Sequence, residues 1–455
     1  MYKRLLLILL LKLLIINITP SQKIFKIPFK KLVTAQYFPN QENPIANKYM
    51  SQLVVEMLVG TPPQKLNCSI ILNSFYSLFL SHEIPDITFP SYYNKTSSQT
   101  YNCTQKEKYY WQEDFNNAET FTDTIKIFDK NNKIILNNNF SFLLIDGLGY
   151  NVPNEFYAPG LIGLRLRKDD NINQIDENRF LYKIKKYGLT NSETFYFDFA
   201  ENEGEDNGYL VIGEELFDND NFLIIYTGQL PMPYLGHEWS FNFDNIYYGD
   251  EEISDKDSLI KTENGLTIGP TSYENVIKGF FKNESQCFFN YTKMGYATFK
   301  YYTCDIDFNE NNMEDLIFEL KTINYKFVFK PKDLFFIENN KKYFKIVFLL
   351  SYPYNQPYWY LGRNFLKKYK LRFDSERKSI YIPLKNEIED KKKNSFFKSS
   401  SFLIIVCLGI IILGLIIFII IYLKKYPRKK RANELQDDDY DYSQKIDNNL
   451  NENIN

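Results

Sequence analysis

The sequence is poor in the residues that metal sites and nucleophilic sites need. It contains only two histidines, His82 and His237, which are far apart and have no paired metal-ligand spacing around them. We therefore expect no metal and no other cofactor, and we expect both histidines to be structural or solvent-exposed. The formal net charge is −2, so the chain has no basic surplus to neutralise phosphates and is not expected to bind nucleic acid.

Cysteine is also scarce. Of the five cysteines, Cys407 lies in a long apolar run, where it is expected to act as a small apolar residue. The other four predict two disulfides if the compartment is oxidising. Sequence order favours Cys68–Cys103 and Cys287–Cys304, although four cysteines allow three pairings.

Two long hydrophobic segments flank the rest of the chain. Residues 1–20 have a basic start, an apolar run and a polar break, a pattern typical of a signal peptide, with an uncleaved anchor as the alternative. Residues 402–423 are apolar and uncharged, and a bilayer needs roughly 20 such residues. Because Lys and Arg follow at once, we expect a cytosolic tail at 424–455 and a juxtamembrane stalk at 385–401.

These ends predict a single-pass type I membrane protein of the cell surface or endomembrane system, with its body luminal or extracellular. Glycosylation sequons agree with that compartment, although several are expected by chance in a chain so rich in asparagine. The candidate sites are Asn67, Asn94, Asn102, Asn139, Asn283 and Asn290.

The body, residues 49–384, consists of short runs of Val, Ile, Tyr and Phe separated by Asn, Asp, Gly and Pro. This pattern favours an all-β architecture. Lys183–Gly188 and Tyr273–Phe281 are the best candidates for short helices.

A series of motifs follows in a fixed order along the body. Gly60–Gln64 reads GTPPQ, and its Pro-Pro pair forces a turn between two flanking strands. The later motifs are Ala158–Leu164, Asn207–Gly213, Gly269–Ser272 (GPTS) and Trp359–Asp374. In this order they resemble the pepsin-like aspartic peptidase family.

The resemblance implies an all-β, bilobal acid protease fold with lobes at about 49–228 and 229–384. A cleft between the lobes would hold a peptide or protein ligand in extended form. The segment 21–48 includes Lys23–Lys31, KIFKIPFKK, which resembles a prosegment strand of the family. An ordinary first strand or linker is the alternative.

The catalytic triplets of the family are changed in this chain. The alignment puts Leu72-Asn73-Ser74 and Lys261-Thr262-Glu263 where the two Asp-Thr-Gly triplets belong. The first alignment needs one extra residue after Gln64, and without it the aspartate position falls on Ile71. Neither alternative supplies an acid, and the loops after Leu72 and Lys261 are expected to meet.

The neighbouring positions depart from the family as well. Thr262 is retained, and Asn73 could keep part of a threonine's hydrogen bonding. Arg363 stands where the closing motif usually has an aspartate. The expected flap hairpin brings Tyr110 and Trp111 over the cleft, but its tip has no glycine, so the flap is degenerate.

Pepsin-like hydrolysis needs two carboxylates that share a proton. We therefore predict no catalytic residues, and a catalytically inactive domain that acts as a peptide- or protein-binding module. The alternatives are an active aspartic endopeptidase with a divergent acid, such as Asp114 or Asp146, and a purely structural or adhesive surface protein. A buried Lys261 needs a carboxylate, either from Glu263 or from a ligand.

Overall fold

The computed structural model describes fourteen stretches of the chain, and most of their residues form β-strands joined by turns. The predicted signal peptide, stalk, transmembrane segment and tail lie outside them. Within the described part, no helix combines the length and the apolar character that crossing a bilayer requires. The described residues are 24–32, 43–49, 51–74, 76–83, 91–111, 114–131, 133–147, 158–166, 179–200, 206–213, 222–227, 238–294, 297–350 and 357–384.

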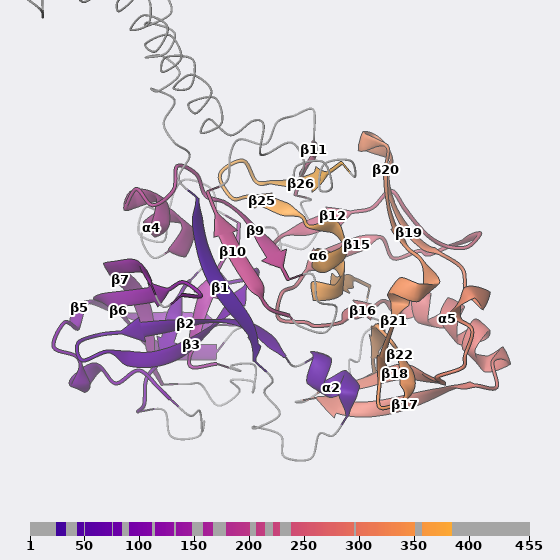
Figure 1. Cartoon of the computed structure of the whole chain (residues 1–455), viewed down its shortest axis with the longest axis horizontal. Coiled ribbons are helices and arrows are strands. Elements are labelled where there is room, and N and C mark those ends of the chain that lie inside the picture. Colours follow the sequence, from indigo (N-terminus) through magenta and orange to yellow (C-terminus); the bar gives the residue numbers. More distant parts are fainter. Residues whose placement is uncertain are drawn as a thin grey trace, which may run out of the picture. The chain divides into compact units, whose positions relative to one another are not determined.

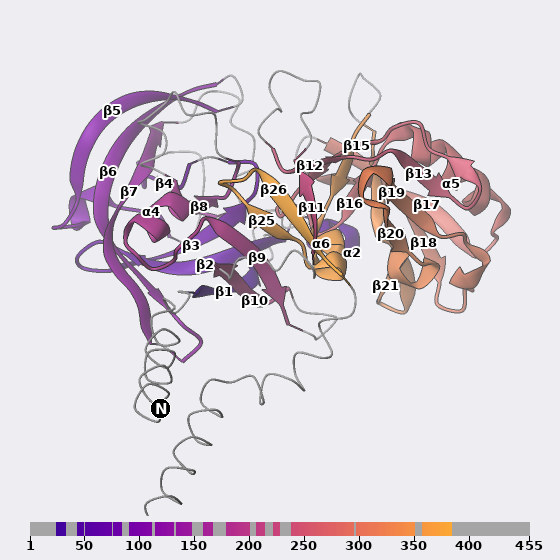
Figure 2. The ribbon, with the colours of Figure 1, turned by 90° about the horizontal axis from the view of Figure 1, so that it is seen from above.

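The first sheet contains the strands of the N-terminal half and two strands from the C-terminal end of the body (Figures 1 and 2). Its strand order is β11-β26-β25-β9-β10-β1-β2-β3-β8-β4-β7-β6-β5. The segment interpreted as a prosegment-like or first strand is β1, which pairs with β10 and β2. The strands are β1 (Phe25–Leu32), β2 (Gln52–Val59), β3 (Gln64–Ile71), β4 (Leu78–Leu80), β5 (Asn102–Trp111), β6 (Asp114–Phe128), β7 (Ile134–Gly147), β8 (Gly160–Gly163), β9 (Thr194–Phe199), β10 (Gly208–Ile212), β11 (Phe222–Tyr226), β25 (Arg372–Asp374) and β26 (Ser379–Pro383).

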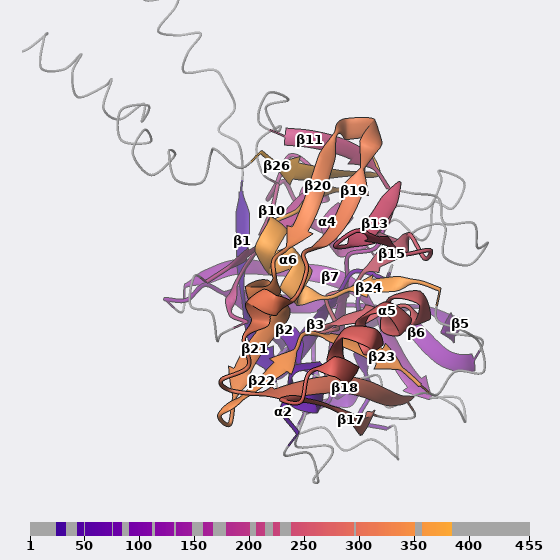
Figure 3. The same ribbon diagram turned by 90° about the vertical axis from the view of Figure 1, so that its right-hand side faces the viewer.

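The second and third sheets are formed by residues 240–361 (Figure 3). The second sheet contains β12 (Ser240–Asn242), β15 (Asp257–Ile260), β16 (Thr267–Gly269), β17 (Cys287–Met294), β18 (Ala297–Asp305), β21 (Phe335–Glu338), β22 (Lys341–Phe344), β23 (Ile346–Leu349) and β24 (Trp359–Leu361). The third contains β13 (Asn245–Tyr248), β14 (Glu251–Glu252), β19 (Leu316–Leu320) and β20 (Tyr325–Phe329).

Both predicted helices are present with shifted bounds. They are α4 (Phe180–Lys186) and α5 (Thr271–Asn283). Two further short helices, α2 (Pro44–Tyr49) and α6 (Arg363–Tyr369), had no clear sequence signal.

The GTPPQ turn joins β2 and β3 as predicted. The two strands pair antiparallel from Val54 opposite Ser69 to Val59 opposite Gln64. Gly60 has a φ of +83°, which favours glycine because larger residues rarely adopt it. The turn therefore fixes the register of the strand that leads to Leu72.

A matching local arrangement occurs twice. In the first half, β3 runs parallel to β8, and the Leu164 N–H donates to the Ile71 carbonyl at 2.8 Å. In the second half, β15 runs parallel to β24, and the Lys261 N–H donates to the Leu361 carbonyl at 2.9 Å. Ile71 lies opposite Gly163, and Lys261 is one residue beyond the pair of Ile260 with Leu361, which places it level with Gly362. By this register Ile71, the alternative position from the sequence, matches Lys261, and Leu72 is one residue further along.

One of the two predicted disulfides is wrong. Cys287 and Cys304 are bonded, but Cys68 and Cys103 are not joined to each other. Cys68 is buried on β3 against β8, whereas Cys103 is exposed on β5, so the two thiols face different surroundings. Burial raises the pKa of the Cys68 thiol, which disfavours the reactive thiolate. The pairing was inferred from sequence order, which does not show whether two cysteine side chains lie close enough and point toward each other, as a disulfide requires.

Candidate functional site

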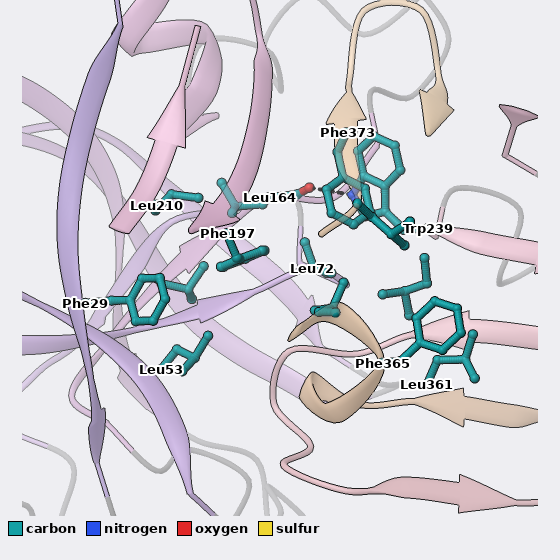
Figure 4. Close-up of a cluster of buried hydrophobic side chains, with 14 of the residues drawn as sticks. Phe29, Leu53, Leu72, Leu164, Phe197, Leu210, Trp239, Leu361, Phe365 and Phe373 are labelled. Carbon is teal, nitrogen blue, oxygen red and sulfur yellow. Dashed lines mark hydrogen bonds between the residues drawn. The ribbon is translucent and has the colours of Figure 1, made fainter. Parts of the chain in front are cut away.

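Leu72 is part of the hydrophobic core. Its side chain is fully buried, in one cluster with Leu53, Leu164 and Phe197 (Figure 4). In the same cluster the Trp239 Nε1 donates to the Leu164 carbonyl at 2.8 Å. Ile71, the alternative position, is buried as well, so neither candidate position of the first loop carries an acid.

The backbone after Leu72 is held close to β8. The Arg165 N–H donates to the Ser74 carbonyl at 3.0 Å. A Cβ at Gly163 would lie 2.4 Å from that same carbonyl oxygen, so only glycine fits there. The Ser74 hydroxyl itself donates to the Tyr76 carbonyl at 3.1 Å. This loop is therefore closely packed although its family glycine is missing.

A hydrogen bond from Thr262 joins the loops of the two halves. The Thr262 Oγ1 donates to the Ile70 carbonyl at 2.8 Å, and both groups are buried. Asn73, which the sequence alignment places opposite Thr262, behaves differently, because its Oδ1 is buried and has no hydrogen-bond partner among the described residues. The expected contact between the loops is present, but it comes from the second loop.

Lys261 lies between two carboxylates. Its Nζ is 3.5 Å from Glu238 Oε2 and 3.6 Å from Glu263 Oε1, and its side chain is 12% exposed. The Tyr360 ring centroid is 5.7 Å from the same nitrogen. Burial lowers the pKa of Lys261, but the charges of Glu263 and Glu238 more than offset that effect, so the pKa is raised overall. Lys261 is therefore a protonated residue with partners from its own chain.

Arg363 holds the second loop through hydrogen bonds to backbone carbonyls. Its Nη1 donates to the carbonyls of Thr262 and Ser51 at 2.8 and 2.7 Å. Its Nε is 3.3 Å from Asp206 Oδ2, and Lys367 forms a second ion pair with that carboxylate. Burial raises the pKa of Asp206, but Arg363 and Lys367 outweigh it and lower that pKa to about 2.

Two acids of this region were missed by the sequence reasoning. Glu238 immediately precedes Trp239, but its contact with Lys261 depends on how β15 is placed. Asp206 immediately precedes Asn207–Gly213, which is one of the motifs. The position of Asp206 beside a motif was the available signal, but the sequence alone does not show which basic residue either acid contacts.

The flap hairpin is present as the β5–β6 pair. Tyr110 lies opposite Phe115, and Trp111 lies opposite Asp114. The side chains of Tyr110, Trp111 and Asp114 lie outside the described part of the structure, and so does His237.

The other candidates from the sequence lie elsewhere. Asp146 Oδ2 is 3.0 Å from Lys95 Nζ, so this acid is held in an ion pair. His82 is exposed. Among the described residues, no group of three or more His, Cys, Asp or Glu side chains could hold a metal ion.

Comparison with known families identifies the class of protein. The eukaryotic aspartyl protease family matches residues 52–383, more than half of the chain. The chain therefore belongs to this family and has a pepsin-like aspartic protease domain, and its mostly β structure is consistent with that fold. No curated protein sequence gives a significant match.

Proposed function

We propose that this protein is a catalytically inactive member of the family that binds a peptide or protein in its interlobe cleft. The proposal includes a type I membrane anchor at residues 402–423 and a luminal or extracellular body.

One observation carries the inactive assignment. Leu72 and Lys261 follow equivalent strands, β3 and β15, and neither can act as the acid or the base of a carboxylate pair. Leucine exchanges no proton. The lysine ammonium is held by Glu238 and Glu263, so it is not available to activate a water.

The same ion pairs bear on what the cleft binds. The Lys261 charge faces two carboxylates of its own chain, so this residue gives no reason to expect a preference for anionic ligands. A pepsin-like domain implies binding of an extended peptide, and we propose that main-chain and apolar contacts dominate that binding.

A protease assay tests the inactive assignment. The purified full-length chain is incubated with an unfolded protein substrate across pH about 3 to 7, where a carboxylate pair could share its proton, with and without a pepsin-class inhibitor. We expect no inhibitor-sensitive cleavage, while an active pepsin-like enzyme run in parallel cleaves. Inhibitor-sensitive cleavage by the unmodified chain would overturn the assignment and favour an active endopeptidase.

A double variant sharpens this test. Replacing both Leu72 and Lys261 by Asp should not restore full activity, because Ser74, Glu263 and the flap tip also depart from the family.

Binding is measured separately, by fluorescence anisotropy of labelled extended peptides. If none of these peptides binds, a purely structural role is favoured.

Protease treatment of intact vesicles should remove only the tail if the proposed topology is right.

A further inference from the structure

The strand β17 forms an open edge of the second sheet. Among the described residues it pairs with β18 alone, in unbroken register from Cys287 opposite Cys304 to Met294 opposite Ala297. Figure 3 shows this hairpin along the lower margin of the sheet. Natural edge strands are usually protected by charges, prolines or bulges, because an open edge pairs with other chains. β17 has no proline, no bulge and one charged residue, Lys293.

This edge also exposes large aromatic side chains. Phe288, Phe289 and Tyr291 are 56%, 56% and 55% exposed. Successive residues of a strand point to opposite faces, so Phe288 lies on one face while Phe289 and Tyr291 lie on the other. An open edge flanked by exposed aromatic rings needs a cover if the protein is to stay soluble.

A glycosylation sequon lies in the middle of this strand. Asn290-Tyr291-Thr292 has the acceptor pattern, and Asn290 is on the same face as Phe288 because they are two residues apart. The Asn290 Nδ2 donates one hydrogen bond to Thr303 Oγ1 at 2.8 Å. A side-chain amide has two N–H groups, so the second one remains for attachment while the first keeps its hydrogen bond.

We propose that Asn290 carries an N-linked glycan that covers the open edge of β17 and the exposed Phe288. In the reaction the Nδ2 loses a proton and forms a bond to the anomeric carbon of an oligosaccharide, while a lipid diphosphate carrier leaves. The glycan is bulky and hydrated, so it blocks strand pairing at this edge. This inference rests on the luminal or extracellular placement of the body proposed above.

Asn102 also lies on an edge strand, β5, but Asn102 and its described neighbours Cys103 and Thr104 are exposed without a large apolar side chain among them. Three further sequons have side chains engaged or buried elsewhere. Asn94 uses its side chain to accept from the Thr96 N–H at 3.0 Å and so caps a short 3-10 helix. The Asn139 Oδ1 accepts from Thr124 Oγ1 at 2.9 Å. The Asn67 Oδ1 is buried. Asn290 differs from these four sequons because its strand exposes Phe288, Phe289 and Tyr291.

The test uses the full-length chain made in a eukaryotic secretory pathway. Glycopeptide mass spectrometry should show Asn290 occupied. Asn290→Gln and Thr292→Ala should each lose one glycan and shift the protein from monomer to dimers or larger species in light scattering. Thr292→Ser keeps the sequon and should stay monomeric, and adding Phe288→Ser to Asn290→Gln should reduce the association. Enzymatic deglycosylation of the folded wild type gives the same readout without any substitution.

The outcomes separate this inference from the proposed compartment. Glycans on other sequons with Asn290 bare would overturn the inference and leave the luminal placement intact. No glycan on any sequon would overturn the luminal placement, and the inference with it. An occupied Asn290 whose removal leaves a monomer would overturn the covering role.

Discussion

The loops after β3 and β15 occupy corresponding places in the two halves, but different forces hold them. Leu72 of the first loop is buried among apolar side chains, whereas Lys261 of the second lies between two carboxylates and the neighbouring Thr262 carbonyl accepts a hydrogen bond from the buried Arg363. In the active enzymes of this family the two loops are expected to carry equal acids. Here the first loop depends on apolar burial and the second on a polar network, so the two loops should respond differently to the same kinds of change.

The largest expected effect tests the apolar side of this comparison. Leu72→Ala removes a fully buried side chain and leaves a cavity, which should lower the free energy of unfolding by about 2–5 kcal/mol. Urea denaturation of the full-length chain measures this loss.

The matched control for Leu72 is Leu350→Ala. Leu350 is 43% exposed, so its truncation should change stability by no more than about 0.5 kcal/mol. Equal small losses at both positions would show that the first loop is not part of the core.

The next effect concerns the acid that supports the second loop. The pKa of Asp206 is lowered from 3.8 to about 2 in the folded protein. A lowered carboxyl pKa adds stability above its unfolded value, and that stability is lost as pH falls from 3.8 towards 2. The contribution is about 2 kcal/mol. Asp206→Asn should therefore lower stability at neutral pH and flatten the loss between pH 3.8 and about 2.

Denaturation midpoints measured across this pH range test the expectation. Asp305→Asn changes an exposed aspartate and should keep the wild-type acid profile. If Asp206→Asn loses stability in acid as steeply as the wild type, Asp206 does not hold the second loop through Arg363.

Local sequence signals predicted the parts of the fold that depend on neighbouring residues. The turn at Gly60–Gln64 and the helix at Thr271–Asn283 follow from motifs within a few positions. Contacts between distant segments could not be predicted in that way. The ion pair of Asp206 with Arg363 and that of Glu238 with Lys261 join parts of the chain that no local pattern relates. The disulfide assigned to Cys68 failed for the same reason, since side-chain direction is decided by the sheet.

The smallest effect tests the contact between the two loops. Thr262→Val keeps the shape of the side chain but removes the hydrogen bond to the Ile70 carbonyl, which should cost about 1 kcal/mol. Thr262→Ser keeps the hydroxyl and should recover that hydrogen bond. Asn73→Ala removes an amide oxygen that has no partner among the described residues, so it should cost less than Thr262→Val in urea denaturation. The reverse order would mean that the first loop, not the second, joins the two halves.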